Sequence, residues 1–159
     1  MNAPVSLDDV VLAEMLWAGF KALFSVIAIL GVMLALKISL SPKLILVPPI
    51  LLIAGVTFAS MALVFNAKAK GYDFFTYYFA VLLSPMMFLS GVFFPRTQLP
   101  AFAQAITDWL PLTAAVELVR PLCLDQWPAD AARHLAVLAL YAIASFWIAL
   151  AFTRQRFRR

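Results

Sequence analysis

The chain has 159 residues, of which 65% are hydrophobic and only 13% are charged. A soluble domain of this size carries about 25% charged residues, so there is too little polar material here to cover a water-soluble surface. Composition therefore excludes an ordinary soluble globular protein. It predicts a single all-α integral membrane domain over residues 1–159, for which lipid is the main solvent.

The remaining composition excludes several kinds of chemistry. The net charge of +4 suits an anionic membrane surface, and no dense basic face with interleaved aromatic residues predicts a nucleic-acid partner. The single cysteine, Cys123, can form neither an internal disulfide nor a multi-cysteine metal site. Residues 1–14 lack a basic segment and contain three acids, so the first apolar run is expected to be a retained span rather than a signal peptide.

Four apolar windows have about the length that crosses a bilayer core, which is about 20 residues. The four transmembrane helices are expected at residues 15–37, 44–66, 74–95 and 134–152. A basic cytoplasmic tail, residues 153–159, follows the last one.

A short cytoplasmic helix is expected before the first span, at residues 4–14. Ser6 and Asp9 form an S-x-x-D capping pattern, and Asp8 and Asp9 suit a helix N-terminus. Two interpretations stay open for this segment. It is either the capped start of the first span or a docking element for a cytoplasmic partner.

The third window contains residues that disturb a regular helix. Pro85 removes a backbone hydrogen bond and predicts a kink, and the Ser84 hydroxyl can satisfy a freed carbonyl. Ser90 and Gly91 are small enough for a neighbouring backbone to approach closely. Pro95 is expected to end the span.

Residues 96–133 are too polar and too rich in proline to span, yet too apolar for an ordinary loop. Helical spacing of apolar residues predicts two short amphipathic helices on either side of Pro111, with Pro121 ending the second. Such a pair is typical of a re-entrant or interfacial helical hairpin, here over residues 99–121.

Polar side chains form one stripe on the second of these helices: Thr113, Glu117 and Arg120. Glu117 is the one acid inside an apolar segment, and such residues often have a function. It is either a partner of Arg120 that lets the helix lie in the interface, or part of a gate or substrate contact.

Aromatic residues gather near the expected membrane boundaries, among them Tyr77, Tyr78 and Trp109. Tyrosine and tryptophan at such positions usually form interfacial belts. Stacking on sugar rings or acyl chains is the alternative.

Orientation is predicted from the lysines and arginines near the span ends. The side of the two termini carries a slight excess, counting Lys68, Lys70 and the four tail arginines against Lys37, Lys43, Arg96, Arg120 and Arg133. Both termini are therefore expected to be cytoplasmic in the inner membrane, which places residues 96–133 on the extracytoplasmic side.

Catalytic and metal-binding patterns are missing from the sequence. It contains no GxxxxGK[ST] phosphate loop and no clustered His and Cys ligands for a metal. His134 stands alone at a span boundary and is interpreted as a headgroup or helix-capping residue. The chain is therefore not expected to be an enzyme or to bind a cofactor directly.

Two C-terminal motifs resemble a known family. The stretch SPMMFLSGVFFP from Ser84, with QLP from Gln98, LPLT from Leu110 and VELVRP from Val116, is similar to the C-terminal signature of type-2 ABC exporter permeases. The similarity extends to residues 4–20, and the nodulation-factor, or lipo-oligosaccharide, exporter branch resembles the chain most.

The resemblance implies a permease that dimerises and works with a separate cytoplasmic ATPase subunit, which binds the ATP. Family members have six spans, a coupling helix before the third, and a re-entrant hairpin between the last two. They export lipid-linked saccharides, polysaccharides or amphipathic drugs. Mapped onto this chain, the coupling segment falls at residues 4–14, with Ser6, Asp8 and Asp9 as ATPase-docking candidates.

The same mapping makes the kinked span and the hairpin the expected pathway region. Its candidate residues are Tyr77, Tyr78, Ser84, Pro85, Ser90, Gly91, Trp109, Thr113, Glu117 and Arg120. The first two spans of the family have no counterpart here, which implies that the reading frame starts late, that the gene is truncated, or that a partner supplies the rest. A non-transporting membrane scaffold, or an inactive permease remnant, is the alternative.

Overall fold

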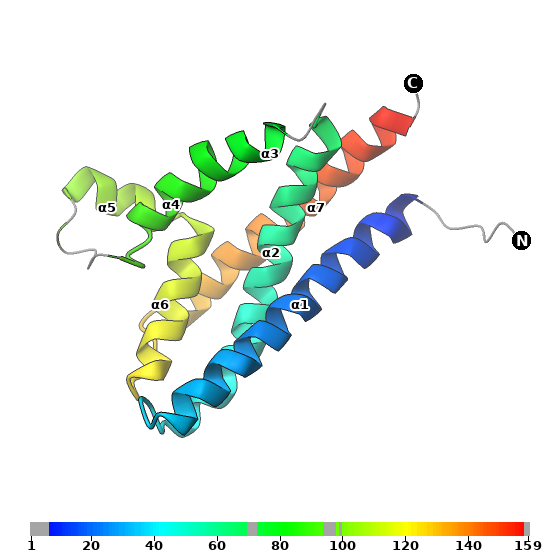
Figure 1. Ribbon diagram of the computed structural model, residues 1–159. Coiled ribbons are helices and arrows are strands. Elements are labelled where there is room, and N and C mark those ends of the chain that lie inside the picture. Colours follow the sequence, from blue (N-terminus) through cyan, green and yellow to red (C-terminus); the bar gives the residue numbers. More distant parts are fainter. Residues whose placement is uncertain (1–6, 70–72, 94–97, 99, 158–159) are drawn as a thin grey trace, which may run out of the picture.

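The computed structural model describes residues 7–69, 73–93, 98 and 100–157. Every regular element in this part of the chain is helical, as the composition predicted. In chain order (Figure 1) they are α1 (Leu7–Ala35), the 3₁₀ helix η1 (Pro42–Leu46), α2 (Val47–Lys68), α3 (Asp73–Tyr77), the π-helix η2 (Tyr78–Leu83), α4 (Ser84–Leu89), α5 (Ala101–Thr107), α6 (Pro111–Cys123) and α7 (Ala131–Phe157).

Among the described residues, three helices are long and apolar enough to cross a membrane: Asp8–Ala35, Pro42–Lys68 and Ala131–Gln155. They correspond to the first, second and fourth expected spans. The third expected span is a shorter apolar helix, Phe74–Leu89. It lies within α3, η2 and α4, which follow one another without a break. At about 1.5 Å per residue this stack is about 25 Å long, somewhat less than a bilayer core of about 30 Å.

The segment expected as a separate cytoplasmic helix is continuous with the first span. From Leu7 onward, α1 runs for 29 residues without a break, and Ser6 lies outside the described residues. The same holds at the other terminus, where α7 continues to Phe157. The expected basic tail is therefore a helical extension through that residue.

The centre of the bundle is α2, which packs against α1 on one side and α7 on the other (Figure 1). Its prolines Pro48 and Pro49 lie in the first turn, where a missing N–H costs least. Thr57 is fully buried, and its hydroxyl is within hydrogen-bonding distance of the Ile53 carbonyl (2.8 Å) and the Leu138 carbonyl of α7 (3.2 Å). The main core draws on three helices: Ala54 from α2, Ala114, Ala115 and Leu118 from α6, and Val137 and Leu138 from α7.

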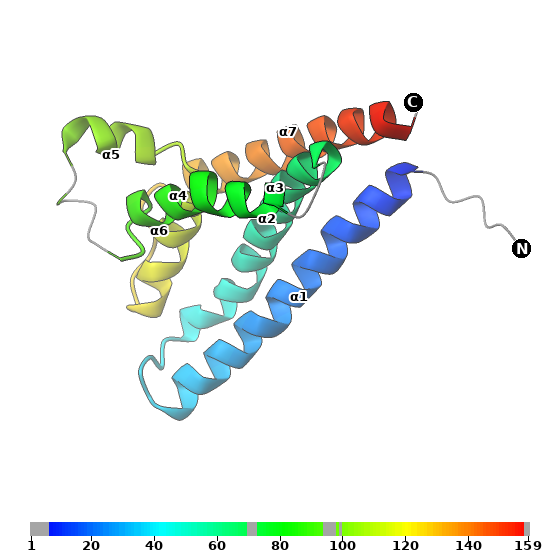
Figure 2. The ribbon, with the colours of Figure 1, turned by 45° about the horizontal axis from the view of Figure 1, so that its top comes forward.

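Both termini lie at the same end of the bundle in Figures 1 and 2. Arg154 near the end of α7 forms an ion pair with Asp8 near the start of α1, and its Nε donates to Asp8 Oδ1 at 3.0 Å. This end we call the terminal end. Which side of a membrane it faces stays a prediction.

The opposite end is held by polar contacts between two loops. The Ser39 hydroxyl donates to the Cys123 carbonyl at 2.7 Å, and the Ser41 hydroxyl donates to Asp125 Oδ1, also at 2.7 Å. Lys43 Nζ lies 3.2 Å from the same carboxylate oxygen. Hydrogen bonds from Ser41 and Lys43 hold the pKa of the Asp125 carboxyl below its usual value. These contacts fix the C-terminal end of α6 beside the start of α2.

The expected irregularity in the third window is present as a π-helical segment just before Pro85. The Phe79 carbonyl accepts the backbone N–H of Ser84 and also its hydroxyl, at 3.1 Å. The Ser84 hydroxyl therefore reinforces a carbonyl that its own N–H already reaches, and its predicted bond to a carbonyl freed by Pro85 stays a prediction. The helix ends at Leu89 rather than at Pro95, which lies outside the described residues, because Gly91 follows with a positive φ of 84°.

The hairpin region contains the two expected short helices, α5 and α6, and α5 projects away from α1 in both views (Figure 2). Pro111 lies in the first turn of α6, as predicted. Pro121 does not end α6 as expected, because the helix continues to Cys123. The start of α7 contacts the link between the two helices through an Arg133–Asp108 ion pair of 3.4 Å.

Candidate functional site

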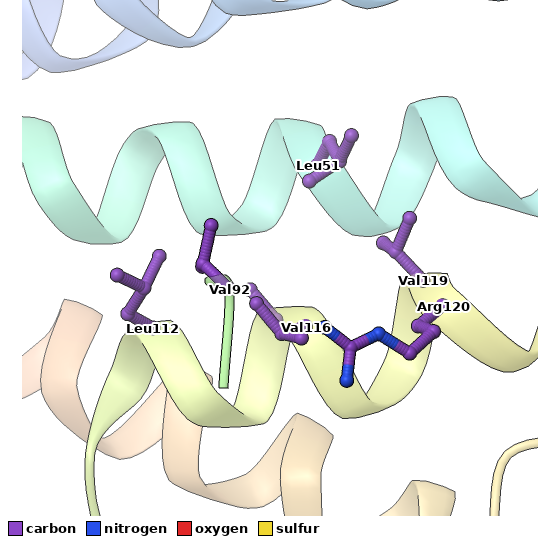
Figure 3. Close-up of a pocket in the computed structure, with 7 residues that line it drawn as sticks. Leu51, Val92, Leu112, Val116, Val119 and Arg120 are labelled. Carbon is purple, nitrogen blue, oxygen red and sulfur yellow. The ribbon is translucent and has the colours of Figure 1, made fainter. Parts of the chain in front are cut away.

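An apolar groove lies between α2 and α6 (Figure 3). Its volume is about 260 Å³. The lining is aliphatic except for one arginine: Leu51, Val92, Leu112, Ala115, Val116, Val119 and Arg120. Figure 3 shows the Arg120 side chain extending back along α6 toward Val116, so its guanidinium lies beside the groove rather than beyond the helix end.

Arg120 joins the hairpin to the end of the third apolar helix. Its Nη2 donates to the backbone carbonyl of Gly91. Gly91 is buried, and its left-handed backbone conformation turns the chain after α4 so that this carbonyl faces α6. The sequence had suggested a close backbone approach at Ser90 and Gly91. The structure places a helix stop here, with Ser90 fully buried and its hydroxyl bonded to the Met87 carbonyl at 3.0 Å, and the close backbone approach stays a prediction.

A second and larger apolar cavity adjoins this groove, because Val92 and Leu112 line both. It has a volume of about 500 Å³. Its walls come from α1, α2, the third apolar helix, α6 and the turn after α4. The lining residues are Ala18, Ala22, Gly55, Phe58, Ala59, Ala62, Tyr78, Leu83, Met87, Val92 and Leu112. We call the two together the long groove. A volume in this range is typical of small-molecule sites, which are about 300–1,000 Å³.

Small residues on α1 and α2 set the shape of the long groove. A Cβ atom on Gly55 would lie 2.9 Å from the Ala22 Cβ, and one on Gly19 would lie 2.8 Å from a Val56 methyl group. The two helices therefore approach as closely as their side chains allow. Larger side chains at Ala18 or Ala59 would occupy the space beside this contact.

Of the three aromatic residues predicted to line a pathway, Tyr78 is the one that lines the long groove. It is half-buried, and its ring centroid lies 4.5 Å from that of Phe65. Tyr77 and Trp109 are instead 67% and 62% exposed, and Arg133 lies 5.9 Å from the centroid of the Trp109 ring. Outward-facing aromatic side chains of this kind suit the interfacial belt better than a binding pocket.

The structure therefore separates the predicted pathway residues. It brings Tyr78 and Arg120 to the long groove, and Gly91 accepts the hydrogen bond from Arg120. Ser84, Pro85 and Ser90 shape the backbone of the third helix, and Glu117 lies half-buried on α6. The role of these residues in a transport pathway stays a prediction. The pairing of Glu117 with Arg120 also stays a prediction.

Two buried polar side chains lie on α6 and α7. Thr113 is fully buried and His134 is 7% exposed. Neither Thr113 Oγ1 nor His134 Nδ1 has a hydrogen-bond partner in the described part of the chain. The interpretation of His134 as a headgroup contact is therefore wrong, because the imidazole faces the protein interior.

Asp8 and Asp9, two of the predicted docking residues, lie at the terminal end. Ser6, the third, lies outside the described residues. Asp9 is exposed, while the carboxylate of Asp8 is engaged by Arg154. Beneath them a pocket of about 630 Å³ opens between α1, α2 and α7. It is more polar than the long groove and is lined by Val10, Val11, Glu14, Leu63, Asn66, Ala67 and Thr153.

Several residues of these sites were not identified from the sequence. The lining alanines and Gly55 looked like ordinary span residues, although Ala18 with Ala22 and Gly55 with Ala59 have the four-residue spacing of small residues that marks close helix packing. Asp8 was identified, but its partner Arg154 lies 146 residues away and could not be.

These apolar helices define a multi-pass membrane protein. Residues 1–124 match the family described as ABC-2 type transporter, so the chain belongs to this family. The finding confirms the family resemblance drawn from the two C-terminal motifs.

The chain is also similar to several curated proteins called Nodulation protein J. The one from Sinorhizobium fredii is 36% identical over 152 residues, and the one from Rhizobium leguminosarum bv. viciae is 38% identical over 151 residues. The aligned region covers 96% and 95% of this chain but 58% of each relative. No solved structure matches the chain.

Proposed function

We propose that this chain is a membrane-spanning permease component of an ATP-driven exporter. It would move lipid-linked oligosaccharides, polysaccharides or amphipathic drug-like molecules outward across the inner membrane. Membership of the ABC-2 type transporter family is the single observation that carries this proposal. The similarity to Nodulation protein J supports the lipo-oligosaccharide class among these substrates.

ATP hydrolysis is assigned to a separate cytoplasmic subunit that docks on the terminal end, and two copies of the permease would face each other in the assembly. Asp9 and the Asp8–Arg154 pair lie at that end. Because α1 continues unbroken from there along α2 and the long groove, a displacement of its start would be transmitted along the helix. Conformational change in the long groove would then follow ATP binding at the partner.

Co-purification with the ATPase subunit tests the docking surface. Asp9→Lys reverses an exposed charge and is expected to reduce recovery of the partner about ten-fold. Asp8 needs a different design, since Asp8→Lys would also repel Arg154. The exchange Asp8→Arg with Arg154→Asp keeps an ion pair while moving the acid from α1 to α7, and it is expected to weaken binding as well.

Asp130→Asn, just before α7 and away from the terminal end, is the control, because it removes an exposed acid at a positive φ that asparagine tolerates. It should leave recovery of the partner unchanged. Full recovery with both terminal-end variants would contradict docking there. If the wild-type protein recovers no ATPase subunit at all, the alternative of a non-transporting remnant would replace the proposal.

A further inference from the structure

The long groove combines an extended apolar wall with a single cation, and this combination points to a ligand of matching chemistry. Between Leu51 beside Arg120 and Ala62 at the far end, α2 advances 11 residues. That is about 16 Å at about 1.5 Å per residue. The hydrocarbon core of a bilayer is about 30 Å thick, so the groove has the length of one leaflet.

Among the described residues, Arg120 is the one charged side chain that lines the groove, and Glu117 lies one turn before it on α6. The Arg120 side chain is exposed on a helix whose neighbours in the groove are aliphatic, and one of its donors is used by the Gly91 carbonyl. A guanidinium has five N–H donors in a planar fork that matches phosphate. Within a membrane such a charge pairs with a polar or anionic group rather than with hydrocarbon.

We propose that the long groove binds one acyl chain of an anionic phospholipid from the surrounding bilayer, with the lipid phosphate on Arg120. The chain would lie along α2 past Gly55 and Ala59 toward Tyr78, between α1 and the third helix. This inference does not rest on the export proposal. It places a bound phospholipid between α1 and the hairpin helix α6.

Native mass spectrometry of the detergent-purified protein tests the assignment, with phosphatidylglycerol and phosphatidylcholine of the same acyl chains as probes. The wild-type protein is expected to retain phosphatidylglycerol about ten-fold better than phosphatidylcholine. Arg120→Gln should abolish this preference. Arg133→Gln, which removes an exposed arginine outside the groove, should preserve it.

A second variant tests the apolar part of the site. Ala59→Phe would fill the groove and is expected to reduce binding of both lipids, while Ala139→Phe on the exposed face of α7 should not. Circular dichroism confirms that each variant is folded before it is scored. Free glycerol phosphate should not compete, because it has no acyl chain.

Three outcomes would overturn the proposal. The preference for phosphatidylglycerol could persist in Arg120→Gln, which would place the anion elsewhere. Glycerol phosphate could displace the lipid, which would show that the groove contributes nothing. Cysteine cross-links between Ala59→Cys positions of two copies would show that a second chain fills the groove.

Discussion

At the residue scale, the clearest electrostatic feature is the Asp125 carboxylate at the end opposite the termini. It accepts from Ser41 and lies 3.2 Å from Lys43 Nζ, and these contacts lower its pKa. A carboxyl that is more acidic in the folded state stabilises that state once it is charged. The stabilisation is complete above the unfolded pKa, about 3.9, and disappears as the pH falls through the lower folded value.

Thermal unfolding in detergent as a function of pH tests this contact. Asp125→Asn is expected to lower the unfolding temperature at neutral pH, with the difference from wild type shrinking below about pH 4. Asp130→Asn is the matched control, because both residues have a positive φ, 58° and 51°, which asparagine tolerates. A pH-independent difference for Asp125→Asn would contradict the assigned role of its charge.

Single residues were predictable where their partners are close in sequence. Ser84 bonds the Phe79 carbonyl five residues earlier, and a serine bond to a nearby backbone carbonyl was foreseeable, although this carbonyl is not one that Pro85 frees. Arg120 reaches the Gly91 carbonyl across 29 residues, and the pairing depends on how the hairpin folds back onto α4. The helical spacing of Thr113, Glu117 and Arg120 predicted a polar stripe on α6. It did not predict that Thr113 would be buried while Arg120 is exposed.

At the element scale, hydropathy predicted the three long helices because each is at least 25 residues long and contains a strongly apolar stretch with few charges. It placed the end of the third helix too late, since a glycine with a positive φ stops a helix that composition alone would continue. It also divided α1 into two segments. The acids near Leu7 looked like the start of a separate helix, although nothing in the chain breaks the helix between Asp9 and Met15.

The close contact of α1 with α2 gives a prediction at this scale. Gly55→Ala places a methyl group 2.9 Å from the Ala22 Cβ, so the helices must separate, and overpacking of this kind costs about 1–3 kcal/mol. A loss of unfolding temperature in detergent is expected. Gly31→Ala, whose added Cβ would meet nothing within 4 Å, should be neutral or slightly stabilising. Equal effects of the two variants would show that Gly55 is not a packing contact.

At the scale of the whole molecule, four expected spans predict both termini at one end, and the Asp8–Arg154 pair agrees with this placement. The long groove was not predictable in the same way. It depends on which small residues of α1 and α2 face the third helix, and on a hairpin whose position is set by contacts distant in sequence. Hydropathy reports that a helix is in lipid, but not which face packs against another helix.

Transport into inverted membrane vesicles tests most directly whether this chain is a permease component of an ATP-driven exporter. Vesicles from cells that produce the chain with its ATPase partner would receive ATP and a fluorescent lipid-linked oligosaccharide. The account predicts ATP-dependent uptake, abolished by a nonhydrolysable ATP analogue and reduced several-fold by Asp9→Lys. Equal uptake by vesicles that contain the ATPase partner but lack this chain would contradict it.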